Sequence, residues 1–305
     1  MKRLIFAAAI SLMIAGPAVA QVPPDIAAQI RKIGQIVDVP NTTKLYAPMF
    51  KDIKEAYASV KVERDIAYGP DPLNKLDVFT PTTGAAGRTV VIFAHGGGFE
   101  RGDKVQKGAP FNDNLMLFLN QHGMVGVNIN YRLAPRNHWP DAQQDMASAI
   151  RWVKANIGQY GGDPNRIVLW GVSAGASLIA TYLSHPEFYG PDGVGVKGAV
   201  MHSGFYVNRE PGSAYFGHDA NELRQRSALD GMKKLNIPLM ISHTEVDLPD
   251  AIVQAETANK ELCAAGHCPA YAVYKDHSHV SQMYSIGTPD TSVSAPVVKF
   301  LTSIK

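Results

Sequence analysis

Apolar, β-rich runs alternate with helix-length segments along most of this chain. A strand with one face in water alternates apolar and polar residues, whereas these runs are apolar over most of their length. Strands of that kind, separated by helices, require a parallel sheet that is covered on both sides. The sequence therefore predicts an α/β fold, with a mostly parallel central sheet covered by helices on both faces. The runs are residues 89–97, 123–133, 166–172, 196–205 and 237–247, and the clearest helical segments are 142–160 and 250–266.

Further elements complete this pattern: strands at 60–69, 74–81 and 270–279, and a closing helix at 294–304. Before them, apolar residues recur at helical spacing between Ile26 and Val37, and a second helical segment precedes the first strand. No internal repeat and no long linker divides the remainder. We therefore expect an N-terminal helical extension over residues 21–58 and one α/β domain over residues 59–305.

Residues 1–20 have the pattern of a secretory signal peptide. Lys2 and Arg3 precede the apolar run LIFAAAISLMI, and AGPAVA ends in an Ala-x-Ala pattern. A membrane anchor is the alternative, but the run is well short of the ~20 residues that span a bilayer. We expect cleavage after Ala20 and a secreted or periplasmic protein.

The charge of the mature chain argues against partners that are held by electrostatic attraction. The whole chain has 29 Lys and Arg against 27 Asp and Glu, and loss of Lys2 and Arg3 leaves 27 against 27. A neutral chain without a basic cluster is not expected to bind nucleic acid or an anionic membrane surface.

The two cysteines of the chain, Cys263 and Cys268, stand close together in CAAGHC. A metal site would need four ligands, and only His267 stands nearby. In an oxidising compartment such a pair favours a disulfide, which would join the end of a helix to the following strand. Two buried free thiols are the alternative.

The sequence GVSAG places Ser173 between two glycines, directly after an apolar strand. A sharp turn from this strand into a helix beginning near Ala174 would lift the serine side chain clear of the backbone. The small residues Gly171 and Gly175 would let strand and helix approach closely. This arrangement is the nucleophile elbow, although Ser173 as a simple helix N-cap is the alternative.

A second glycine-rich segment, HGGGF, ends another apolar strand about 75 residues upstream of Ser173. Consecutive glycines can turn backbone N–H groups toward a ligand without a side chain in the way. We expect Gly97, Gly98 and Ala174 to form an oxyanion hole. A flexible loop or a phosphate site is the alternative, but the Gly-Lys-Ser/Thr ending of a phosphate loop is missing.

A nucleophilic serine needs a histidine as base and an acid that orients the histidine, and on this fold the order is serine, acid, histidine. YKDHSHVSQ offers His277 and His279, and His279 is preferred because it lies further along the loop. An H-x-H metal fragment is disfavoured because no partner ligands accompany it. The remaining histidines, among them His95 beside the glycine loop, are expected to be structural.

Three acids follow the next-to-last strand in EVDLPDA. Asp247, in the turn between strand and helix, is the expected member of the triad. Glu245 sits nearer the strand and would face solvent, and Asp250 follows Pro249 where it would cap the helix.

The motifs HGGGF, NYRLAP, YGGDPNRIVLWGVSAGA and DHSHVSQ together resemble the α/β-hydrolase carboxylesterases related to hormone-sensitive lipase, from about residue 60 to the C-terminus. The resemblance implies an α/β-hydrolase fold, with residues 59–305 as the catalytic domain. It implies Ser173 as nucleophile, His279 as base and Asp247 as acid, with no metal or other cofactor and a small ester as substrate. Tyr131 to Pro135 and Asp163 are structural supports in that family.

The chain departs from the family pattern in two ways. Val172 stands where many members have an acidic residue, and Ala176 stands where they have glycine. The segments available for a cap are residues 24–58, 99–114 and 205–232. The segment 205–232 contains four aromatic residues that either pack in the core or line the substrate pocket: Phe205, Tyr206, Tyr215 and Phe216.

The leading hypothesis is a serine esterase for short acyl groups, because no Leu-rich lid segment is evident near the site. Aryl formamides, acetylated or feruloylated polysaccharides and peptides are alternative substrates for the same triad. A binding protein on a hydrolase scaffold is a further alternative. The N-terminal helices could cap the site, pack on the body, or contact a second subunit, so the oligomeric state is left open.

Overall fold

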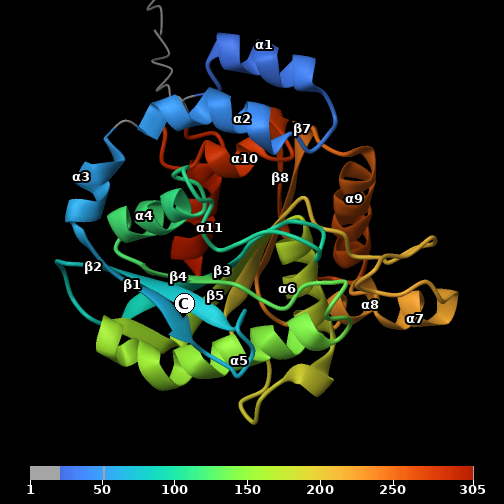
Figure 1. Ribbon diagram of the computed structural model, residues 1–305. Helices are drawn as coiled ribbons and strands as arrows, with labels where there is room; N and C mark the ends of the chain where they lie inside the picture. Colours follow the sequence, from blue (N-terminus) through green and yellow to red (C-terminus); the bar gives the residue numbers. More distant parts are fainter. Residues whose placement is uncertain (1–20, 51, 305) are drawn as a thin grey trace, which may run out of the picture.

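The computed structural model describes residues 21–50 and 52–304, and an eight-stranded sheet forms its centre (Figure 1). The strand order is β1-β2-β4-β3-β5-β6-β7-β8, in which β2 pairs antiparallel with both β1 and β4 and the other pairs are parallel. The predicted α/β fold with a mostly parallel sheet is thus confirmed. The strands are β1 (Val60–Ala67), β2 (Lys75–Pro81), β3 (Arg88–Ala94), β4 (Val125–Ile129), β5 (Gly162–Val172), β6 (Gly198–His202), β7 (Leu239–Val246) and β8 (Ala270–Ser278).

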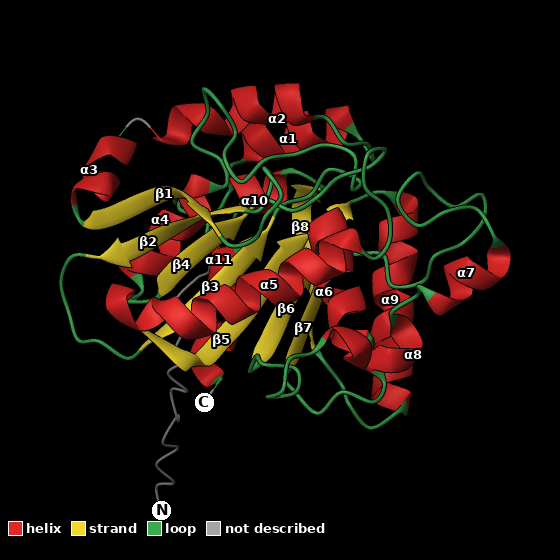
Figure 2. Cartoon of the chain, turned by 60° about the horizontal axis from the view of Figure 1, so that its bottom comes forward, coloured by secondary structure: helices red, strands yellow, loops and turns green. Residues whose placement is uncertain are grey.

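Helices cover the sheet on both sides. The helices are α1 (Pro24–Ile33), α2 (Val39–Tyr46), η1 (Ala47–Phe50), α3 (Ile53–Ala58), α4 (Asp113–Gln121), α5 (Asp141–Asn156), η2 (Ile157–Tyr160), α6 (Ala174–Ser184), η3 (Pro186–Phe188), α7 (Ala220–Gln225), α8 (Leu229–Met232), α9 (Pro249–Ala264), α10 (Ser281–Tyr284) and α11 (Ser294–Ser303). Apolar residues of α5, α6, α8 and α9 share one core cluster, and those of α1, α4, α10 and α11 share the other. Figure 2 shows α5 in front of the sheet, on the side opposite α11.

Alternate residues of the central strands supply the two cores. In β3, Val90 and Ile92 face one core, whereas Val91 and Phe93 face the other. Because successive side chains of a strand point to opposite faces, only a strand that is apolar throughout satisfies both layers. Trp170 of β5 packs edge-on against Phe93, with ring centroids 6.0 Å apart.

The N-terminal helices pack on the body near the last strand. Residues Ile26, Ala27 and Ile30 of α1 are buried, and Arg31 forms an ion pair with Asp276 of β8. In α2, Tyr46 is fully buried and belongs to the same core cluster as α10. Figure 1 shows α2 beside α10. Of the three placements that the sequence left open, packing on the body is confirmed, and Val37 and Val39 also line a cavity that contains Ser173. Contact with a second subunit stays a prediction.

The predicted signal peptide, residues 1–20, lies outside the described residues. Among the residues that are described, the structure contains no helix that is both long and apolar enough to span a membrane.

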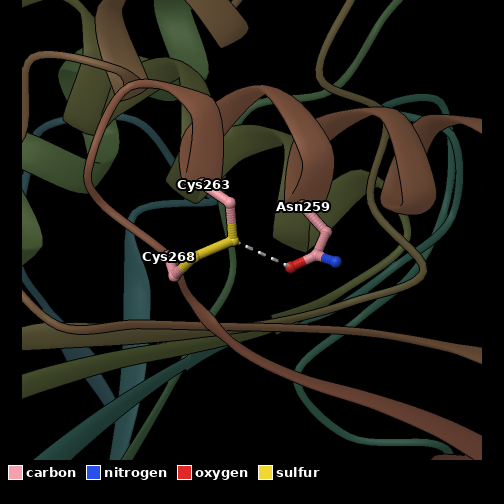
Figure 3. Close-up of a disulfide and its surroundings, with 3 residues drawn as sticks. All are labelled: Asn259, Cys263 and Cys268. Atoms are coloured by element: carbon pink, nitrogen blue, oxygen red, sulfur yellow. Dashed lines mark hydrogen bonds between the residues drawn. A yellow bond between two sulfur atoms is a disulfide. The ribbon is translucent and has the colours of Figure 1, made fainter.

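A disulfide joins Cys263 and Cys268, as Figure 3 shows. Cys263 lies in the last turn of α9, and Cys268 lies two residues before β8 begins. The bond therefore joins the end of a helix to the following strand, as expected. The side-chain oxygen of Asn259, one turn earlier in α9, lies 3.9 Å from the sulfur of Cys263.

Replacing both cysteines by serine should lower the free energy of unfolding by about 2 kcal/mol, because opening so short a loop releases little chain entropy to the unfolded state. Chemical denaturation of the oxidised protein and of the double variant measures the difference. Equal stability of the two proteins would contradict this expectation.

Candidate active site

Ser173 occupies a sharp turn between β5 and α6. Its backbone has φ 54° and ψ −124°, a conformation that non-glycine residues rarely adopt, and its N–H donates to the carbonyl of His202 at 2.9 Å. The turn requires small neighbours, because a Cβ on Gly175 would lie 2.0 Å from the carbonyl oxygen of Ala94. The side chain of Ser173 makes no capping hydrogen bond to α6, so the N-cap alternative fails.

Asp247 follows β7 directly and is fully buried. Its carboxylate accepts four hydrogen bonds: from Ser203 Oγ at 2.5 Å, His279 Nδ1 at 2.6 Å, Leu248 N at 2.8 Å and Thr244 N at 3.0 Å. Burial by itself would raise the pKa of Asp247, but these hydrogen bonds and the imidazole lower it below its ordinary value. The group is therefore a carboxylate at neutral pH.

His279 follows β8 directly and is also buried. Since a carboxylate only accepts, Nδ1 of the ring must carry the proton that bonds Asp247. This leaves Nε2 as the basic nitrogen, and it has no hydrogen-bond partner among the described residues. Ser173 and His279 line the same cavity.

The two other acids of this segment bond to partners other than His279. Glu245 is exposed and accepts a hydrogen bond from the backbone N–H of Asp276 at 2.9 Å. Asp250 forms an ion pair with Arg209 at 3.5 Å and accepts a hydrogen bond from Gln254. The expectation that Asp250 caps its helix is wrong, because the N-cap position of α9 is Leu248 and no side chain bonds there.

The two histidines of the H-x-H pair belong to separate networks. His277 is buried, with Nε2 3.2 Å from Asp290 Oδ2 and 2.9 Å from Ser292 Oγ, and with Nδ1 3.1 Å from Ser281 Oγ. Ser281 Oγ in turn accepts from the backbone N–H of Ser278. His277 thus braces the segment that carries His279 and does not face the same cavity.

The glycine segment after β3 runs beside Ser173. Gly97 has φ 123°, and a Cβ there would lie 1.9 Å from the carbonyl oxygen of Arg101, so only glycine fits. His95 holds the segment through a hydrogen bond of 2.7 Å between Nδ1 and the carbonyl of Gly96. Burial lowers the pKa of His95, which keeps its ring neutral. Tyr131 stacks on that ring and donates to the carbonyl of His95 at 2.8 Å, which is a structural support of the kind expected.

Two buried residues that the sequence argument does not identify connect Asp247 to the histidine segment. Ser203, at the end of β6, has φ 51° and donates to Asp247. Gln282 of α10 donates from Nε2 both to Ser203 Oγ at 2.6 Å and to the carbonyl of His279 at 3.0 Å. The one available signal for Ser203 is its place at the carboxyl end of a strand, beside the ends of β5 and β7.

Two cavities open at Ser173. One, of about 460 Å³, is lined by Phe205, Phe216 and residues of the segment 207–213, among others. The other, of about 680 Å³, is lined by His279, by Val172 and by the turn between α1 and α2. Of the four aromatic residues singled out in the sequence, Phe205 and Phe216 line a cavity, and Tyr206 and Tyr215 are core residues.

Acyl transfer by a serine nucleophile requires a hydroxyl, an imidazole that a carboxylate orients, and backbone N–H donors. One cavity of this chain has a hydroxyl, such an imidazole and glycine N–H groups. Similarity to known proteins agrees with this chemistry. Residues 76–186 match the model of the BD-FAE family.

Curated relatives match part of the chain. A probable carboxylic ester hydrolase, LipM of Mycobacterium tuberculosis, is 39% identical over 138 residues, which cover 43% of this chain and 31% of the relative. The isoprenylcysteine alpha-carbonyl methylesterase ICME of Arabidopsis thaliana is 34% identical over 140 residues, covering 46% of this chain and 32% of the relative. The matched region therefore spans about a third of the length of each relative.

Solved structures share the fold over most of the chain. Esterase B from Lactobacillus rhamnosis has a TM-score of 0.67 at 19% identity and covers 92% of this chain and 96% of its own. A truncated carbohydrate esterase from gut microbiota has a TM-score of 0.63 at 18% identity, with coverage of 80% and 95%. With the sheet and the turn at Ser173, these likenesses show that the chain has the α/β-hydrolase fold, and its matched part is similar in sequence to proteins named as carboxylic ester hydrolases and esterases.

Proposed function

We propose that this protein is a serine hydrolase that cleaves carboxylic esters through a triad of Ser173, His279 and Asp247. The observation that carries the proposal is the buried hydrogen bond of 2.6 Å between Asp247 and His279. It leaves Nε2 of His279 as a base at the cavity that contains Ser173. Relatives named as esterases support the same reaction class.

In the proposed reaction, Ser173 Oγ attacks the ester carbonyl while His279 Nε2 accepts the hydroxyl proton. Asp247 stabilises the imidazolium that results. Collapse of the tetrahedral intermediate breaks the bond to the alcohol oxygen, which takes the proton from Nε2 and leaves an acyl-serine. Water, deprotonated by His279, then hydrolyses the acyl-serine and restores Ser173.

The negative charge on the carbonyl oxygen needs donors that are fixed in advance, and we assign them to the N–H groups of Gly97, Gly98 and Ala174. Ala174 N is available because the first N–H groups of a helix have no partner within the helix. Gly97 and Gly98 stand in a segment that His95 and Tyr131 hold rigid. No metal or organic cofactor takes part in this mechanism.

Residues 21–58 are proposed as a helical extension of a catalytic domain that spans residues 59–305. Export to the periplasm or the medium is proposed from residues 1–20, and the disulfide between Cys263 and Cys268 agrees with an oxidising compartment.

An ester with a short acyl group remains the preferred substrate. An aryl formamide, a polysaccharide ester or a peptide would use the same triad.

Ser173→Ala should lower the hydrolysis of p-nitrophenyl acetate by about a million-fold, because it removes the nucleophile. The wild-type protein should react with an organophosphate at Ser173, and the variant should not, as mass spectrometry of the labelled peptide would show. In the series from acetate to decanoate, rates should fall as the acyl chain lengthens. Retained activity in Ser173→Ala would refute the proposed mechanism.

Asp247→Asn should lower kcat by about 10⁴-fold, because an amide can donate to Nδ1 and so favours the wrong tautomer of His279. The matched control is Asp290→Asn, which makes the same change beside the other buried histidine, His277. Steady-state kinetics should show a loss of kcat in the first variant and little change in the second. Similar losses in both would mean that Asp247 acts only through stability.

Ser203 and Gln282 are positioning residues in this proposal. Ser203→Ala removes a hydrogen bond to a charged carboxylate, a contribution of about 1.5–3 kcal/mol, so kcat should fall by roughly tenfold or more. KM should stay unchanged, because Ser203 lines neither cavity. Ser242→Ala is the control, since Ser242 is equally buried but bonds His202 instead. A purely structural role of Ser203 would change thermal stability without changing kcat.

A further inference from the structure

The two cavities at Ser173 share some of their lining residues. They differ in which residues of the proposed reaction line them. Gly98, Ser173 and Phe205 line both of them. His279 lines only the larger cavity, and Ala174 lines only the smaller one. An ester that reacts at Ser173 therefore has two separate spaces for its two halves.

The position of His279 decides which half enters which space. In the tetrahedral intermediate the alcohol oxygen must lie within hydrogen-bond reach of Nε2, because the proton taken from Ser173 leaves on that oxygen. The acyl carbon chain is then directed away from His279. The larger cavity consequently receives the alcohol, and the smaller cavity receives the acyl group.

The linings of the two cavities differ in polarity. The larger one is mostly apolar, although Arg101 and Asp103 also line it. Its apolar residues include Val37, Val39, Val105, Val172, Val280 and Met283. The smaller one mixes aromatic residues with the polar and charged side chains of Asn208, Arg209, Glu210 and Asp250. A long alkyl chain in the smaller cavity would displace water from the exposed ion pair of Arg209 and Asp250 without replacing its hydrogen bonds, which is unfavourable.

Exposed apolar residues occur in the turn that borders the larger cavity. Val37 is 44% exposed and its neighbour Ile36 is 53% exposed, in the turn between α1 and α2. A large apolar alcohol in this cavity would cover part of that surface, and removal of apolar area from water favours binding. The turn is held in place from both sides, since α1 packs on β8 and Thr43 of α2 accepts a hydrogen bond from Gln106 at 3.1 Å.

We propose that the substrate is an ester of a bulky apolar alcohol with a compact acyl group, and that Val37 is a specificity-determining residue for the alcohol. The inference rests on the proposed function and names the substrate class of the same site. Acyl transfer to Ser173 releases the alcohol from the apolar cavity, and water then releases the small acid.

Isomeric esters with exchanged halves test this assignment. Hexyl acetate and ethyl hexanoate have the same atoms, but only hexyl acetate places the long chain on the alcohol. Wild-type protein should hydrolyse hexyl acetate with a kcat/KM at least tenfold higher. Equal rates, or a preference for ethyl hexanoate, would overturn the assignment while leaving the serine mechanism intact. Absence of Ser173-dependent hydrolysis of p-nitrophenyl acetate would instead refute the proposed function.

A bulky residue at the mouth of the larger cavity gives a second test. Val37→Trp should lower kcat/KM for hexyl acetate by about tenfold or more and leave ethyl acetate almost unchanged, because ethanol does not reach the mouth. Val273→Trp is the matched control, since Val273 is 52% exposed on β8 and lines neither cavity. Loss on ethyl hexanoate but not on hexyl acetate would place the acyl group beside Val37 and overturn the proposal.

Discussion

The buried carboxylate of Asp247 is the group on which the arrangement of this site depends. An isolated charge in a protein interior is strongly unfavourable, so the fold must supply partners for both carboxylate oxygens. It does so from three consecutive strands of the sheet: Ser203 after β6, Thr244 within β7 and His279 after β8. Parallel strands make this possible because their carboxyl ends meet at one edge. The same hydrogen bonds that stabilise the charge also fix the orientation of the imidazole.

Support for the site extends into the N-terminal helices. Gln106, in the loop that follows the glycine segment, accepts a hydrogen bond from Tyr284 at 2.5 Å and donates one to Thr43 of α2. This single side chain therefore connects the glycine loop, α10 and the N-terminal region. Arg31 of α1 pairs with Asp276, three residues before His279. The helices that carry the apolar rim of the larger cavity are thus tied to the strand that precedes the base.

The sequence predicts much of the fold and of the site because local chemistry determines both. Strands such as β3 are apolar on both faces, and the glycines beside Ser173 are required by contacts closer than any side chain allows. Other features have no local signal. Helix α4 is short and has eight of its nine residues buried, and Ser203 and Gln282 are identified only by a contact between segments far apart in the sequence. The cap expected of Asp250 is wrong because α9 begins at Pro249, which makes Leu248 the N-cap residue. Asp250 pairs instead with Arg209 from a separate loop, a contact without a local signal in the sequence.

Val172 stands where many members of the family that this chain resembles have an acidic residue. This difference fits the division of the site into two cavities. Val172 lies directly before Ser173 and lines only the larger cavity, where a carboxylate would face the apolar side chains of Val280 and Met283. Such a charge would need a partner or water and would disfavour an apolar group beside it. Charged residues line both cavities: Arg101 and Asp103 in the larger one, and Arg209, Glu210 and Asp250 in the smaller one. Valine at this position therefore places no charge directly beside Ser173 in the larger cavity, which agrees with our proposal that an apolar alcohol occupies that cavity.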